Sequence, residues 1–244
     1  MKFAPIVPIK CSPGELSSVH LILAHLVLSD SSYREYYKSL EVRGHTIILD
    51  NSVIELGEPL PASSLLEARE HFPRAVFVLP DRLRDYEGTV GVVREASASG
   101  LVCGHLMIVP QGVDWLEWLQ CFGRLKEVLS SASGVLSVVV GVPRLTEDWP
   151  GGRSCLLSFM LSAEVWKGPF WLLGIQHSLG EVSWAKGLEG VLGFDSSLPV
   201  KAAAAGVHPR NVRNLRELPD SEAYSIEDVR ENVRFISRWC VDGA

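Results

Sequence analysis

The feature that most constrains this chain is a regular alternation between short apolar runs and amphipathic stretches. The runs consist of continuous aliphatic and β-branched residues, so we expect each one to form a buried strand. The expected strands are residues 19–28, 45–50, 75–80, 105–110, 136–142, 170–175 and 191–194. Apolar strands that alternate with helices predict a parallel sheet covered by helices on both faces.

Helix start and stop signals accompany these strands. Asp30 or Ser31 is expected to cap a helix that ends at Gly44, and Ser197 is expected to cap one that ends at Gly206. Further helices are expected over residues 61–71, 86–99, 113–130, 153–165 and 182–187. Residues 225–240 predict a last helix, which packs against the sheet or, as the alternative, forms a dimer interface.

We therefore predict an α/β fold, a TIM-type (β/α)8 barrel that forms a single domain over residues 1–244. Residues 1–206 approximate the barrel core and residues 207–244 form a C-terminal extension. The seven strands leave an eighth to be found, either at residues 4–9 or in the C-terminal part. An open doubly wound sheet is the alternative, but no GxGxxG motif follows any strand.

Composition narrows the functional classes. The net charge is −6, so any polyanion partner has to be bound by local cations rather than by an overall basic surface. No apolar run is long enough to span a bilayer, and the proline-rich start does not resemble a secretory signal. Five scattered cysteines without a CxxC pair predict a cytoplasmic protein with no disulfide framework and no cysteine-built zinc site.

Polar groups follow the expected strands at one end. In a barrel the carboxyl ends of the strands meet on the catalytic face, so these groups are expected to share one pocket. A single member of this set is more often a turn residue than a catalyst, but several in register favour a site. The residues are Asp50, Asn51, Asp81, Gln111, Gly141, Arg144, Gln176, His177 and Asp195.

The ordered segments ILDNS, LPD, IVPQG, VVVGVPR and GFDSSLPVK resemble the tRNA-guanine transglycosylases. They are more similar to the phage and bacterial DNA-modifying relatives of these enzymes, the DpdA proteins. The resemblance covers about 150 residues, from Asp50 to Lys201. Two departures point to the DNA branch: the CxCxxC zinc motif of the tRNA enzymes is missing, and their DSGGFQ segment is DNSVIE here.

The resemblance implies a base exchange that needs two carboxylates and no cofactor. Asp195 is expected to be the nucleophile at C1′, and Asp50 the acid and base. The residues expected to bind the base are Asp81, Gln111, Gly141 and Asn51. The substrates would be DNA with a single-stranded or flipped-out guanine and a 7-deazaguanine base such as preQ0.

Phosphate contacts are expected from Arg82, Arg144, Lys201, Arg210 and Arg213, with Arg84, Arg153 and Arg216 as further candidates. His177 would orient a carboxylate, contact the sugar or serve a structural hydrogen bond. The resemblance leaves monomer and homodimer open. The alternatives are the same exchange on tRNA or other RNA, and a non-catalytic nucleic-acid-binding partner subunit.

Overall fold

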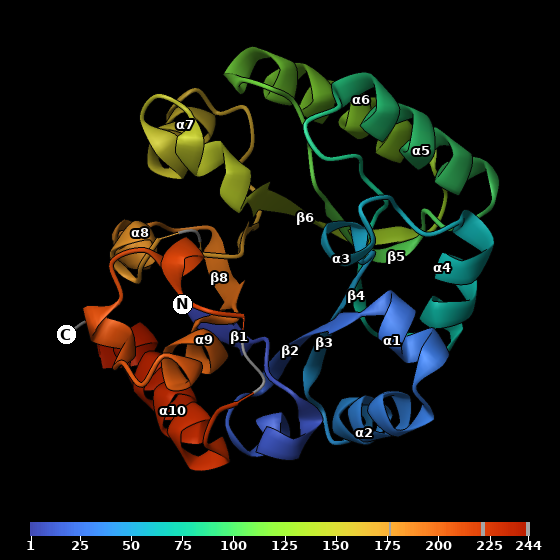
Figure 1. Ribbon diagram of the computed structural model, residues 1–244. Coiled ribbons are helices and arrows are strands. Elements are labelled where there is room, and N and C mark those ends of the chain that lie inside the picture. The colour runs from blue at the N-terminus through green and yellow to red at the C-terminus, as the bar shows by residue number, and fades with distance from the viewer. Residues whose placement is uncertain (176, 221–222, 243–244) are drawn as a thin grey trace. The chain divides into compact units, whose positions relative to one another are not determined.

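The computed structural model describes residues 1–175, 177–220 and 223–242. In this part of the chain eight strands lie in one sheet in the order β1-β8-β7-β6-β5-β4-β3-β2, and they alternate with helices (Figure 1). The predicted (β/α)8 barrel fold with a C-terminal helix is confirmed. The strands are β1 Lys2–Pro5, β2 Val19–Leu23, β3 Thr46–Asp50, β4 Val76–Val78, β5 Gly104–Ile108, β6 Val135–Pro143, β7 Phe170–Leu173 and β8 Val191–Ser196.

The helices occupy most of the segments where the sequence predicts them. They are α1 Ala24–Ser29, α2 Ser31–Val42, α3 Val53–Leu56, α4 Ala62–Glu70, α5 Tyr86–Ala98, α6 Trp115–Ser131, α7 Gly152–Ser162, α8 Gly180–Ser183, α9 Leu198–Ala204 and α10 Ile226–Asp242. No helix in the described ranges is both long and apolar enough to cross a bilayer. The chain divides into two compact units, Ile22–Gly141 and the pair Met1–Leu21 with Val142–Ala244.

The unit Ile22–Gly141 is built on the parallel pairs β3–β4, β4–β5 and β5–β6. Its strands bury Leu49, Phe77 and Leu106, each with no exposed surface. Helices α5 and α6 pack side by side (Figure 1), and Trp118 stacks on Phe122 with ring centroids 5.9 Å apart. The buried face of α6 therefore follows the predicted amphipathic pattern.

The other unit pairs β8 with both β1 and β7 in parallel register. Phe3 of β1 packs on Phe194 of β8, with ring centroids 5.0 Å apart. Helix α10 packs against α9 and β1 through Val229, Val233 and Ile236, which are fully buried. The predicted packing of the C-terminal helix on the barrel is thus found within this unit.

The structure corrects two local predictions, the strand at residues 19–28 and the Ser197 cap, and identifies the eighth strand. The apolar run 19–28 is not one strand: β2 ends at Leu23, and the rest forms α1. The eighth strand is β1, which begins earlier than residue 4 and places Ala4 opposite Asp195. Ser197 makes no side-chain cap; instead the Ser196 hydroxyl accepts the Leu198 N–H at 3.0 Å.

At Gly193 in β8, the Lys2 backbone of β1 and the Trp171 ring of β7 approach the strand very closely. A Cβ at this position would lie 2.3 Å from the Lys2 carbonyl oxygen and 2.8 Å from Cζ3 of Trp171. Both neighbours are held in place, one as backbone and one as a buried ring, so neither can move away cheaply. The missing side chain is what lets Trp171 lie across β8.

We expect Gly193→Ala to lower the free energy of unfolding by about 2 kcal/mol, because the added methyl overlaps fixed atoms. Gly123→Ala is the matched control, since a Cβ on this α6 glycine would meet nothing within 4 Å. The control should raise stability by roughly 0.5–1 kcal/mol through helix propensity. Urea titration measures both changes, and equal stability of Gly193→Ala and the wild type would contradict the packing described.

Candidate active site

A buried carboxylate, Asp81, lies just beyond the end of β4 and is only 3% exposed. Asn51 Nδ2, beyond β3, donates to Asp81 Oδ1 at 2.7 Å. Gln111 Nε2, beyond β5, donates to Asp81 Oδ2 at 2.5 Å. The structure therefore brings together three of the four predicted base-binding residues, from the ends of three neighbouring strands.

Backbone groups fix the orientation of both amides. Asn51 Oδ1 accepts the Val53 N–H at 2.9 Å, so its nitrogen faces Asp81. Gln111 Oε1 accepts the Arg84 N–H at 3.1 Å, which turns its nitrogen toward the same carboxylate. Because an amide has one donor end and one acceptor end, these backbone bonds define which end meets Asp81.

Burial raises the pKa of Asp81 from 3.8 to about 6, and the hydrogen bonds from Asn51 and Gln111 act in the opposite direction. Neutral amides, not a cation, make both side-chain hydrogen bonds to this carboxylate. Burial of the charged carboxylate costs free energy, because two neutral amides do not fully replace the water that is removed. A ligand that donates N–H groups to the carboxylate would reduce this cost.

Asp50, the expected acid and base, is the last residue of β3 and is half-buried. Its Oδ1 accepts the Ser52 N–H at 2.7 Å, and Ser52 has a left-handed backbone with φ 65°. Glycine takes this left-handed conformation more easily than serine does. Arg84, which donates to Gln111, also has a positive φ, 59°.

Asp195, the expected nucleophile, lies in β8 and is 4% exposed. Trp171 Nε1 donates to its Oδ1 at 2.9 Å, and the Gly174 N–H donates to its Oδ2 at 3.0 Å. Burial raises the pKa of Asp195 to about 6, against these two hydrogen bonds and the positive charges of Arg153 and Arg144. The carboxylate is therefore rigidly held and mostly ionised at neutral pH.

Arg153 is not the phosphate contact that the sequence suggested, because its side chain is fully buried. Its guanidinium pairs with Glu181, lies 3.6 Å from Glu147 Oε2 and donates to the Gly174 carbonyl at 2.9 Å. Gly174 thus receives support from Arg153 on one side and donates to Asp195 on the other. Arg153 is a positioning residue for the segment that holds the candidate nucleophile.

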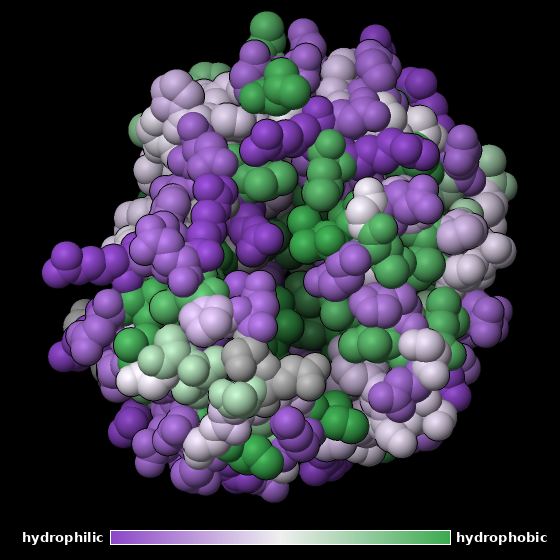
Figure 2. Space-filling view, viewed as in Figure 1, coloured by the Kyte–Doolittle hydropathy of each residue, from purple (hydrophilic) through white to green (hydrophobic). Residues whose placement is uncertain are grey.

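The other predicted cations differ in their surroundings. Arg82, Arg144 and Arg213 are exposed, Lys201 pairs with Asp220 at 2.7 Å and Arg216 pairs with Asp148 at 3.1 Å. Arg210 lies over the Phe235 ring, 5.7 Å from its centroid. Hydrophilic and hydrophobic side chains are interspersed on the face shown in Figure 2. The three arginines of residues 210–216 lie on a loop with two short 3-10 turns, not on one helix face.

The other predicted site residues are His177, Gly141 and Gln176. The His177 N–H donates to Glu181 Oε2 at 2.7 Å, and its carbonyl accepts the Leu215 N–H at 2.8 Å. Gly141 is buried in β6, next to Val140, which pairs with Ile108 of β5. Gln176 lies outside the described residues. Asp50, Asn51, Asp81, Gln111 and Gly141 belong to one compact unit and Asp195 to the other.

Two contributors to the site escaped sequence reasoning. Trp171 reads as one more apolar residue of a buried strand, yet its indole N–H holds Asp195. The available signal was the need of a buried indole N–H for an acceptor. Glu181 belongs to no recognisable sequence motif. Its ion pair with Arg153 shows that it helps to hold this buried arginine in place. No protein-family model matches the sequence, and comparison with curated proteins finds no match.

The raised pKa of Asp81 predicts a pH-dependent stability. Its folded-state pKa lies above the unfolded value, so the folded state binds this proton more tightly and the contribution to stability is lost as the pH rises through about 6. The stability of the wild type relative to Asp81→Asn should therefore increase by on the order of 2 kcal/mol between about pH 7.5 and pH 4.

Denaturant titration across this range measures the difference, with Asp228→Asn as the control at an exposed carboxylate. A constant difference between wild type and Asp81→Asn would mean that the Asp81 carboxyl titrates near its ordinary value.

Proposed function

We propose that this protein is a DNA-guanine transglycosylase, which exchanges guanine in DNA for a 7-deazaguanine base such as preQ0. The observation that carries the proposal is the buried Asp81 carboxylate, held by Asn51 and Gln111 at the ends of neighbouring strands. The ordered motifs that resemble the transglycosylases, in particular their DNA-modifying branch, support the choice of reaction and polymer.

The Asp81 carboxylate, held by Asn51 and Gln111, is complementary to the edge of guanine that carries N1–H and the 2-amino group. Guanine presents two adjacent donors, N1–H and the 2-amino group, and a carboxylate accepts from both. Each oxygen of Asp81 accepts one amide hydrogen in the structure and retains a further lone pair for a ligand. Adenine lacks the 2-amino group and has an acceptor at N1, so it would leave the buried carboxylate without these partners.

Asp195 supplies the nucleophile for the exchange. Its carboxylate forms a bond to C1′ as the C1′–N9 bond breaks, and the bonding electron pair leaves with guanine. Asp50 gives the departing base a proton and later takes one from N9 of the incoming 7-deazaguanine. That nitrogen then bonds to C1′ and releases Asp195. One glycosidic bond replaces another of similar energy, so the exchange consumes no ATP.

The hydrogen bonds to Asp195 serve both halves of this reaction. Donation from Trp171 and Gly174 fixes the carboxylate for attack and stabilises the carboxylate that is released in the second half. Because the pKa of Asp195 is about 6, the nucleophile is ionised above that pH. A guanine inside a duplex cannot reach such a group, so the base must be unpaired or flipped out.

The proposal predicts that the purified protein incorporates labelled guanine into guanine-containing single-stranded DNA. Asp195→Asn should abolish both incorporation and any covalent protein–DNA adduct, because an amide is a poor nucleophile at C1′. Asp81→Asn should retain the nucleophile but lose selection of guanine, since one acceptor becomes a donor. Asp228→Asn, at an exposed carboxylate of α10, is the matched control and should incorporate label normally.

Incorporation is measured as label retained on the polymer, with DNA and RNA strands of the same sequence in competition. DNA should be labelled in preference to RNA. Labelling of RNA alone would favour the tRNA-type enzyme, and full incorporation by Asp195→Asn would show that the nucleophile is a different residue.

A further inference from the structure

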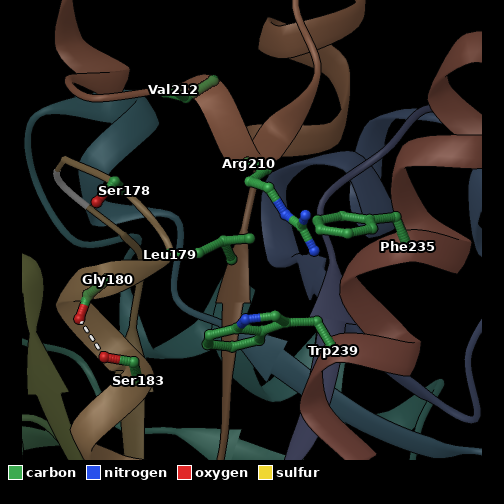
Figure 3. A pocket seen from close by; sticks show the side chains of 8 residues that line it. All are labelled: Ser178, Leu179, Gly180, Ser183, Arg210, Val212, Phe235 and Trp239. Carbon is green, nitrogen blue, oxygen red and sulfur yellow. Dashed lines mark hydrogen bonds between the residues drawn. The ribbon is translucent and has the colours of Figure 1, made fainter. Parts of the chain in front are cut away.

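A pocket of about 490 Å³ opens in the unit that contains Asp195. Its wall has two sides, seen in Figure 3: the segment after β7 with α8, and the loop after α9 with α10. Ser178, Leu179, Gly180 and Ser183 form the first side, and the second is formed by Arg210, Val212, Phe235 and Trp239. Arg210 is one of the expected phosphate contacts, and none of these residues is assigned to the exchanged base or to its C1′.

The lining combines aromatic rings, a cation and hydroxyl groups. Among the described lining residues Arg210 carries the charge, and no carboxylate accompanies it. Phe235 and Trp239 offer two half-buried rings on α10, while the serines lie on the opposite side. A positively charged aromatic pocket fits a ligand that is both anionic and planar.

One cation lies against each ring, Arg210 against Phe235 and Lys186 against Trp239. The Arg210 guanidinium carbon lies 5.7 Å from the Phe235 centroid, and the His208 ring meets Phe235 edge-on at 4.4 Å. The Lys186 ammonium lies over the Trp239 ring, 3.3 Å from its centroid, and donates to the Trp239 carbonyl. A base that stacks on these rings would therefore place its phosphate near fixed positive charge.

The pocket is tied to the segment that holds the candidate nucleophile. The His177 carbonyl accepts the Leu215 N–H at 2.8 Å, so the loop that carries Arg210 is bonded to the segment after β7. That segment begins at Gly174, whose N–H donates to Asp195. The Arg210 loop is therefore hydrogen-bonded to His177, three residues along the chain from the Gly174 N–H that holds Asp195.

We propose that this pocket binds one unstacked nucleotide of a single-stranded DNA substrate, outside the guanine to be exchanged. The base stacks on Trp239 and Phe235, and the adjoining phosphate pairs with Arg210. Stacking of this kind tolerates any base, because every base presents a π-face. The choice of DNA as the polymer rests on the proposed function, but the binding site itself is defined by the lining residues.

The test uses a short fluorescein-labelled oligothymidylate and a strand of equal length made of abasic residues. Neither contains guanine, so no base exchange takes place and binding is measured alone by fluorescence anisotropy. The wild type should bind the thymidine strand about tenfold more tightly than the abasic strand. Trp239→Leu should remove this preference, whereas Trp239→Tyr, which keeps a ring, should retain it.

Phe159→Leu is the matched control, since Phe159 is an exposed ring on α7 outside the pocket, and it should bind as the wild type does. Arg210→Gln should weaken binding of both strands and lower the slope of log Kd against log salt by about one. Thermal unfolding confirms that each variant is folded.

An unchanged preference for thymidine in folded Trp239→Leu would overturn the pocket assignment, whether or not the protein exchanges bases. Displacement of the strand by an equal concentration of thymidine monophosphate would also overturn it, because the pocket would then serve a free nucleotide. Base-dependent binding without guanine incorporation would instead retain the pocket and contradict the proposed exchange.

Discussion

Two carboxylates buried at strand ends impose the main physical constraint on this molecule. Water is removed from Asp81 and Asp195, and this desolvation raises the pKa of each to about 6. Neither forms a direct ion pair in the described contacts; oriented N–H groups hold them instead. A buried carboxylate remains tolerable only when such donors are fixed, so the surrounding backbone has to be rigid.

That rigidity explains several otherwise unrelated features. Ser52 and Arg84 both have a left-handed backbone conformation. The Ser52 N–H donates to the Asp50 carboxylate, and the Arg84 N–H donates to the Gln111 side-chain oxygen. Gly193 leaves room for Trp171, and Arg153 is buried to hold the Gly174 carbonyl. Within each compact unit, such features therefore surround a buried carboxylate and keep its hydrogen-bond donors in place.

The sequence predicts the strands and helices well because their apolar periodicity is local, and it places Asp81 and Asp195 at strand ends for the same reason. It does not locate the boundary at Ala24, since residues 19–28 are apolar enough for either a strand or a helix. The partners of Asp195 depend on contacts distant in sequence: Trp171 lies 24 residues away. Arg153 was misassigned because arginines are usually exposed, and only Glu181, 28 residues later, reveals its burial.

Nucleoside mass spectrometry is the direct test of whether the protein exchanges guanine in DNA through Asp195. DNA is digested from cells that express the protein and have an intact 7-deazaguanine pathway, beside cells that express Asp195→Asn at the same level. We expect a 7-deazaguanine deoxynucleoside in the first DNA and none in the second. Unmodified DNA from cells with the wild-type protein, or equal modification with both proteins, would contradict it.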